Sequence, residues 1–170
     1  MNWCQPVGRF AALAVNSARD APNLAAMRDV AERIGIKVLP FYAAGQHDYE
    51  AAFAEMTRAK ADALEIISAP ELFIDAAMLA GLARKAGLPT ICEWASMAAQ
   101  GCLVGYGPDF PELHRRVADY VARLLRGAAP GDLPIEGPTH FDFAVNLKAA
   151  KALNLTVPTS ILLRANEVIE

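Results

Sequence analysis

The feature of this sequence that most constrains its fold is a regular alternation of short apolar segments with amphipathic helical segments. The apolar segments begin about 26 residues apart, a spacing that fits one strand, one crossover helix and two short loops. Strands that alternate with helices in this way predict a parallel sheet with right-handed crossovers and helices on its faces. We therefore expect a three-layer α/β/α unit of Rossmann-like kind. Its predicted core strands are residues 10–16, 36–42, 62–68 and 88–93.

Between these strands, apolar residues recur with the period of a helix. The predicted helices cover residues 23–34, 49–60 and 72–85. Gly35 and Gly87 follow the first and third helices at the position where a helix end favours glycine. Pro40 lies inside the second strand and removes one donor from its ladder, which predicts an edge position for that strand.

After residue 93 the alternation changes. Residues 94–100 are predicted to be a short link and residues 102–106 a fifth strand. The longest predicted helix runs from Phe110 to Arg126, with Pro111 in its first turn, where a missing N–H group costs nothing. Its apolar face holds seven large side chains, which are Phe110, Leu113, Val117, Tyr120, Val121, Leu124 and Leu125.

The end of the chain is predicted to return from this helix through a Pro- and Gly-rich loop. We expect an antiparallel or edge strand over residues 140–147 and a short helix over residues 148–153, followed by Asn154 in a left-handed conformation. A last short helix is expected within residues 161–169.

Composition excludes several classes of protein. Hydrophobic residues make up 54% and charged residues 21% of the 170 residues, so the chain is not disordered. The net charge of −3 gives no basic surface, so we expect no nucleic-acid partner. No apolar run reaches the length of about 18 residues that a membrane span needs. The first six residues lack the basic and apolar parts of a signal peptide.

The cysteines and histidines do not have the spacing of a metal site. Cys4, Cys92 and Cys102 are odd in number and widely separated, and the three histidines lie far from one another. We therefore expect no metal. We expect Cys92 and Cys102 to be small buried apolar residues, because free cysteine is among the most buried residue types. Cys4 is left unassigned.

Ligands of parallel α/β sheets bind beyond the carboxyl ends of the strands. Alternatives stay open for some residues at these ends. Asn16 and Asn23 can accept hydrogen bonds from turn and helix-cap N–H groups without binding a ligand, and Trp94 can pack in the core. Glu93 is an acid at the end of a buried strand and needs a partner or a function. The sequence places at these ends small or polar groups that can hold a polar solute, and rings that can stack: Asn16, Ser17, Ser68 and Glu93, and Tyr42 and Trp94.

Catalytic motifs are absent from the sequence. It contains no GxSxG, GxGxxG or GxxxxGK[ST], and no histidine stands near a serine or cysteine in a recognisable order. No catalytic residue can be named, so we expect binding without catalysis and without a cofactor.

Ordered sequence motifs give the chain a family resemblance. They include GRFAALAVN, AGLPTICEW, GYGPD, LLRGAAPGDLPIE, FAVNLKAAKALNL and LLRANEVIE. From Gly8 on, the chain resembles ABC-transporter substrate-binding proteins of the tryptophan/tyrosine-type family, which have the type I periplasmic-binding fold. It departs from the family at Asn154, where glycine is usual, at Asn16-Ser17, where Asn-Pro is frequent, and at Cys92, where an aromatic residue is common.

The resemblance covers only the second half of a two-lobed protein. It implies that residues 8–95 and 131–170 form the second lobe, and that the strand and helix within residues 101–127 belong to the absent first lobe. Tyr106 would then reach the ligand from the other side of the cleft. Without that lobe, the apolar face of the helix from Phe110 to Arg126 predicts a homodimer with Leu113, Val117, Tyr120 and Leu124 in its interface.

The function that the resemblance implies is that of the solute-binding component of an ABC importer, or a remnant of one. Its ligand would be a small polar molecule, including aromatic amino-acid-like ones, its second partner a membrane permease, and its location periplasmic or extracytoplasmic. Two alternatives stay open, a ligand-sensing regulatory module with the same lobe and an enzyme on a Rossmann-like scaffold. The candidate binding residues are Asn16, Ser17, Ser68, Glu93, Trp94 and Tyr106.

Overall fold

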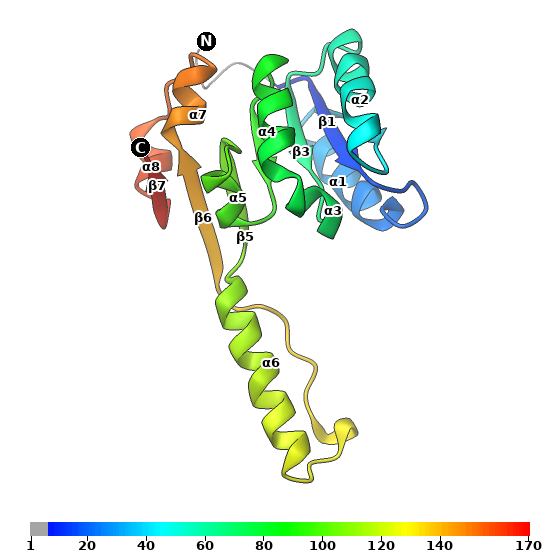
Figure 1. The fold of residues 1–170 in the computed structure, drawn as a ribbon, viewed down its shortest axis with the longest axis vertical. Helices are drawn as coiled ribbons and strands as arrows, with labels where there is room; N and C mark the ends of the chain where they lie inside the picture. The colour runs from blue at the N-terminus through cyan, green and yellow to red at the C-terminus, as the bar shows by residue number, and fades with distance from the viewer. Residues whose placement is uncertain (1–6) are drawn as a thin grey trace.

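The computed structural model describes residues 7–170, so Cys4 and the residues on which the signal-peptide argument rests lie outside the described part. The described residues form one sheet with helices packed on it, and one long helix projects away from this body (Figure 1). The strands are β1 (Arg9–Ala14), β2 (Lys37–Tyr42), β3 (Ala63–Ile66), β4 (Thr90–Cys92), β5 (Val104–Pro108), β6 (Phe141–Asn146) and β7 (Glu167–Ile169). Their order across the sheet is β2-β1-β3-β4-β5-β6-β7, and β5 and β6 are the one antiparallel pair among them.

The helices cover the two faces of the sheet unequally. They are α1 (Ala21–Arg33), α2 (Gln46–Arg58), α3 (Pro70–Ile74), α4 (Ala76–Lys85), α5 (Ala95–Ala99), α6 (Phe110–Leu125), α7 (Leu147–Ala152) and α8 (Thr159–Leu162), with one 3-10 turn, η1 (Pro130–Asp132). Helix α1 packs through Leu24 and Ala31 against the small side chains of β1. Helices α2, α4 and α5 cover the other face and enclose the larger core. Helices on both faces confirm the three-layer α/β/α prediction.

The predicted core strands are confirmed as β1 to β4. Four consecutive residues of β1, Ala11 to Ala14, are fully buried, because helices pack on both of its faces. Strand β2 lies at the edge of the sheet, as Pro40 predicted. Gly35, Gly87 and Asn154 all have a positive φ at the ends of helices, which confirms the positions assigned to them.

Two of the helix predictions need correction. The helix expected over residues 72–85 is divided at Asp75 into α3 and α4, and the Asp75 carboxylate accepts hydrogen bonds from Tyr49 and Gln46 of α2. The helix expected at the end of the chain is limited to the single turn of α8. Strand β7 follows it because β6 has a free edge, where Asn166 exchanges hydrogen bonds with the backbone of Phe143.

The assignment of β5 to a first lobe stays a prediction. Among the described residues, β5 lies in the same sheet as the other strands. It pairs in parallel with β4 and over its whole length with β6. Gly105 and Gly107 make this possible. A Cβ atom at these positions would lie 2.4 Å from the carbonyl oxygen of Trp94 and 1.8 Å from that of Glu93, respectively, so any side chain would push β5 away from the end of β4.

Helix α6 projects from the body (Figure 1). None of its residues is buried. Asp109 caps its first turn by accepting from the backbone N–H of Glu112. The chain that returns toward β6 lies along one side of the helix, where Tyr120 donates to the carbonyl of Pro134 and Arg116 pairs with Glu136. The assignment of α6 to a first lobe stays a prediction.

Cys92 and Cys102 are fully buried, as expected, but the expectation that they are free is wrong, since they form a disulfide. The parallel pairing of β4 with β5 brings the two ends of the intervening segment together, with the two Cα atoms 6.4 Å apart. A pair of cysteines flanking a short connection between adjacent strands was the available signal in the sequence.

The double variant Cys92→Ala/Cys102→Ala should lower the free energy of unfolding by about 3 kcal/mol, because the crosslink closes a short loop of the unfolded chain. The measurement is urea unfolding followed by circular dichroism, with Cys4→Ser as a control that removes a thiol outside the disulfide. A loss well under about 1 kcal/mol would show that the crosslink does not constrain the unfolded chain as the loop-entropy account requires.

Candidate functional site

The predicted site residues that follow parallel strands do lie at the same edge of the sheet. Asn16 and Ser17 stand in the connection between β1 and α1, Ser68 follows β3, and Glu93 and Trp94 follow β4. Strands β1, β3 and β4 are consecutive and parallel, so their carboxyl ends meet. This edge is where α/β sheets bind ligands.

The side chain of Asn16 is engaged in a turn. Its Oδ1 accepts from the backbone N–H groups of Ala18 and Arg19, at 2.9 and 3.1 Å, which matches the alternative that it serves turn donors. Ser17 is exposed beside it. Asn23 is not a helix cap, because α1 begins two residues before it and Asp20 stands at the N-cap position.

A buried acid holds this turn in place. The carboxylate of Asp20 accepts from the backbone N–H groups of Val15 and Asn16 and from the Nε of Arg19. Burial alone would raise the pKa of Asp20, but these donors outweigh it and the pKa is lowered. Arg19 also reaches Glu71 at the start of α3, at 3.5 Å, so it joins the connections that follow β1 and β3.

Three of the predicted site residues line one open groove of about 760 Å³ on the face of the sheet that carries α1. Ser68, Glu93 and Tyr106 belong to it, together with Asn23 of α1 and Glu65 of β3. The rest of the lining is apolar, and Ile91 in its floor is 41% exposed because α1 covers only the β1 and β2 side of this face. Tyr106 lines the groove from β5 of the same sheet.

Two carboxylates lie in this apolar groove without a cation. No Lys, Arg or His within residues 7–170 forms an ion pair with Glu65 or Glu93, and the buried Oε2 of Glu93 has no hydrogen-bond partner there. Burial raises the pKa of Glu65, and the charge of Glu93 raises it further. A ligand group that carries a positive charge would relieve both carboxylates.

Trp94 lies apart from this groove. It packs against the core under α2, α4 and α5, and its ring meets the ring of Phe110 edge-on with centroids 4.9 Å apart. Tyr106 instead stacks on Phe141, with centroids 5.9 Å apart. The six predicted residues are thus divided between the groove, the edge of the sheet and the base of α6.

Sequence reasoning missed Glu65 as a member of the site. The available signal was a single charged residue inside the apolar segment of residues 62–68. The other acid of the groove, Glu93, directly follows the neighbouring strand β4. Only the register of β3 with β4 brings the two acids to one face of the sheet.

Two further features are absent among the described residues, a metal-binding group and a membrane-spanning helix. Within residues 7–170, no group of three or more His, Cys, Asp or Glu side chains is arranged to hold a metal ion. In the same range no helix has the length and apolar character that crossing a membrane requires.

Replacing Glu65 by Gln should stabilise the protein at neutral pH. Because the pKa of Glu65 is raised in the folded state, the stability that its protonation provides is lost as the pH rises through that pKa. Glu65→Gln should therefore raise the midpoint of thermal unfolding at about pH 7, and the gain should disappear below about pH 4, where the acid is protonated in both states.

The control for this prediction is Glu50→Gln, which makes the same chemical change at an exposed position of α2. Differential scanning calorimetry at the two pH values measures both variants. A gain for Glu65→Gln that is equal at both pH values would contradict the assignment of the effect to the buried charge.

Solved structures share this fold. A conserved domain protein from Vibrio cholerae superposes with a TM-score of 0.86 and 24% identity, over 95% of this chain and 55% of that one. The ABC domain from Streptococcus pneumonia in complex with L-Trp superposes with a TM-score of 0.85 and 22% identity, over 96% of this chain and 57% of that one. A substrate-binding protein with adhesive properties from Clostridium difficile, in a ligand-free, open structure, superposes with a TM-score of 0.70 and 16% identity. The match covers 96% of this chain and 55% of that one. The chain thus spans little more than half the length of these proteins.

Comparison with curated proteins gives no match. The model of one protein family, described as ABC transporter substrate binding protein, matches residues 10–169, which is nearly the whole of the part that the structure describes. The match runs from β1 to β7 and includes α6. The chain therefore belongs to the family of ABC transporter substrate-binding proteins.

Proposed function

We propose that this chain is part of the solute-binding component of an ABC importer, and that its ligand is a small amino-acid-like molecule with an aromatic ring. The observation that carries the proposal is the family match over residues 10–169. The L-Trp complex of a protein with the same fold supports the class of ligand. The proposal needs no chemistry at the site, because binding and release suffice for transport.

The polar and aromatic groups at the carboxyl edge support this class of ligand. Ser17 and Ser68 offer exposed hydroxyl groups, and Trp94 offers a ring that is partly exposed. Glu93 carries a carboxylate oxygen with no partner among the described residues, which suits the ammonium group of an amino acid.

The Cys92–Cys102 disulfide supports an extracytoplasmic location, because disulfides persist in oxidising compartments and are rare in the cytosol. A membrane permease is then the protein partner that transport requires. Genes for a permease and an ATPase beside this one would support transport, whereas a neighbouring gene for a kinase or a DNA-binding protein would favour the sensing alternative.

L-Tryptophan, titrated into the protein in a calorimeter, should give saturable binding. Trp94→Ala should weaken that binding by roughly tenfold, since loss of an aromatic contact in a binding site costs more than about 1 kcal/mol. Trp94→Phe keeps a ring and should retain most of the affinity. No saturable heat with L-tryptophan, L-tyrosine or L-phenylalanine would contradict the proposed ligand class.

We further propose that α6 is an association surface and that two copies of the chain associate through it. Its apolar side chains are exposed in the single chain, including Val117 at 62%, Val121 at 48% and Leu125 at 84%. A surface of this kind is unusual on a monomer. A symmetric dimer through Leu113, Val117, Tyr120 and Leu124 would bury it, with a total interface above about 1,000 Å².

Multi-angle light scattering at tens of micromolar protein should give about twice the 18.2 kDa of one chain. Leu124→Asp should shift the protein to monomers or cause precipitation, because it places a charge in the apolar interface. Arg115→Asp puts the same carboxylate on the charged side of α6 and should leave the dimer intact. A monomer of the unmodified chain, without aggregation, would contradict the proposal.

A further inference from the structure

The segment that joins β4 to β5, residues 93–103, presents two of the candidate binding residues at its start and contains α5. We refer to it as the β4–β5 connection. Glu93 faces the groove and Trp94 packs against Phe110 and the core. Both side chains are attached to a segment with one short helix, so their positions depend on what holds this segment to the sheet.

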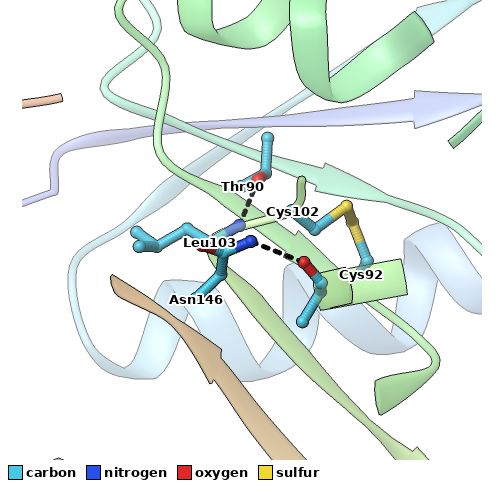
Figure 2. The surroundings of a disulfide bond; sticks show 6 residues. Thr90, Cys92, Cys102, Leu103 and Asn146 are labelled. Atoms are coloured by element: carbon cyan, nitrogen blue, oxygen red, sulfur yellow. Dashed lines mark hydrogen bonds between the residues drawn. A yellow bond between two sulfur atoms is a disulfide. The ribbon is translucent and has the colours of Figure 1, made fainter. Parts of the chain in front are cut away.

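The disulfide closes the β4–β5 connection at both ends. Cys92 is the last residue of β4 and lies directly before Glu93, while Cys102 is the second-last residue of the connection (Figure 2). Beside the disulfide, the hydroxyl of Thr90 accepts from the backbone N–H of Leu103 at 2.9 Å in a buried position. One covalent bond and one buried hydrogen bond therefore join the base of β4 to the residues that enter β5.

Asn146 holds the middle of the same connection from the far side. Its Nδ2 donates to the carbonyl of Ala98 in α5 at 2.7 Å (Figure 2). Its Oδ1 accepts from the backbone N–H of Ala149. The residue itself is 4% exposed. A buried amide with its donor and acceptor both paired fixes α5 relative to the start of α7.

The third constraint is the absence of a side chain at two positions of β5, Gly105 and Gly107. The carbonyl groups of Glu93 and Trp94 rest on Gly107 and Gly105, at distances that a Cβ atom would not permit. The two binding candidates are thus held from three directions, by the disulfide, by Asn146 and by the glycine surface of β5.

We propose that the Cys92–Cys102 disulfide and Asn146 are positioning elements of the binding site, which hold Glu93 and Trp94 in place for the ligand before it arrives. The identity of the ligand in this inference rests on the proposed function. Groups that are fixed before binding lose less conformational freedom when the ligand arrives, so affinity falls when the constraint is removed.

Fluorescence of Trp94 tests the positioning without any ligand. The chain has two tryptophans, Trp3 and Trp94, so Trp3→Phe leaves Trp94 as the single reporter. In that background, Cys92→Ala/Cys102→Ala should lower the steady-state anisotropy of Trp94 and shift its emission to longer wavelength, because the ring gains freedom and water. Asn146→Ala keeps the disulfide and should move both readouts in the same direction by a smaller amount.

The control for general loss of stability is Leu24→Ala, which removes a buried side chain of α1 from the separate core on the other face of the sheet. It should lower the unfolding midpoint and leave the anisotropy of Trp94 unchanged. Circular dichroism shows which variants are folded. If the cysteine variant does not fold, Asn146→Ala decides the question.

Binding of L-tryptophan, measured by calorimetry, should weaken by roughly three- to tenfold in the cysteine variant, as expected when one or two side chains must be ordered on binding. Failure of the unmodified chain to bind would count against the proposed function, while the fluorescence result would still test the positioning. Folded cysteine and Asn146 variants with the anisotropy and emission of the parent would overturn the inference.

Discussion

The close approach of β5 to the end of β4 is the constraint on which the rest of this structure depends. Gly105 and Gly107 let the strand pass beneath the carbonyl groups of Trp94 and Glu93, at distances that exclude any side chain. Because β5 is paired there, β6 can add to its other edge in the antiparallel direction, and β7 can add to β6. The disulfide and the Thr90 hydrogen bond are consequences of the same approach, since they need the two strands side by side.

The unequal cover of the two sheet faces determines the character of the candidate site. Helices α2, α4 and α5 close one face into a core, whereas α1 leaves the other face open beyond β1. Parallel sheets are normally covered on both sides. The open part contains Glu65 and Glu93, two acids that a closed apolar core could not hold without a partner. This face can therefore accept a charged or polar group that the opposite face would exclude.

The three arrangements at the carboxyl edge have different physical roles. Asp20 and Arg19 hold the turn after β1, Asp20 through hydrogen bonds to the backbone and Arg19 through an ion pair with Glu71. The β4–β5 connection is held covalently. Helix α6 begins where Phe110 meets Trp94, so the helix that projects from the body starts beside a candidate binding residue. The position of the Trp94 ring and the start of α6 therefore depend on the same contact.

The sequence by itself determined the parallel core, the edge position of β2 and the carboxyl ends of α1, α4 and α7. These follow from local periodicity and from the conformational preferences of Gly35, Pro40, Gly87 and Asn154. It also supplied the family through motifs that run from β1 to β7. Only the tertiary structure decided the place of β5, the pairing of Cys92 with Cys102, and the joining of Glu65 with Glu93. Each of these depends on which strands are neighbours and in what register, and the free energy of that choice comes from contacts between residues far apart in the chain, which no local pattern records.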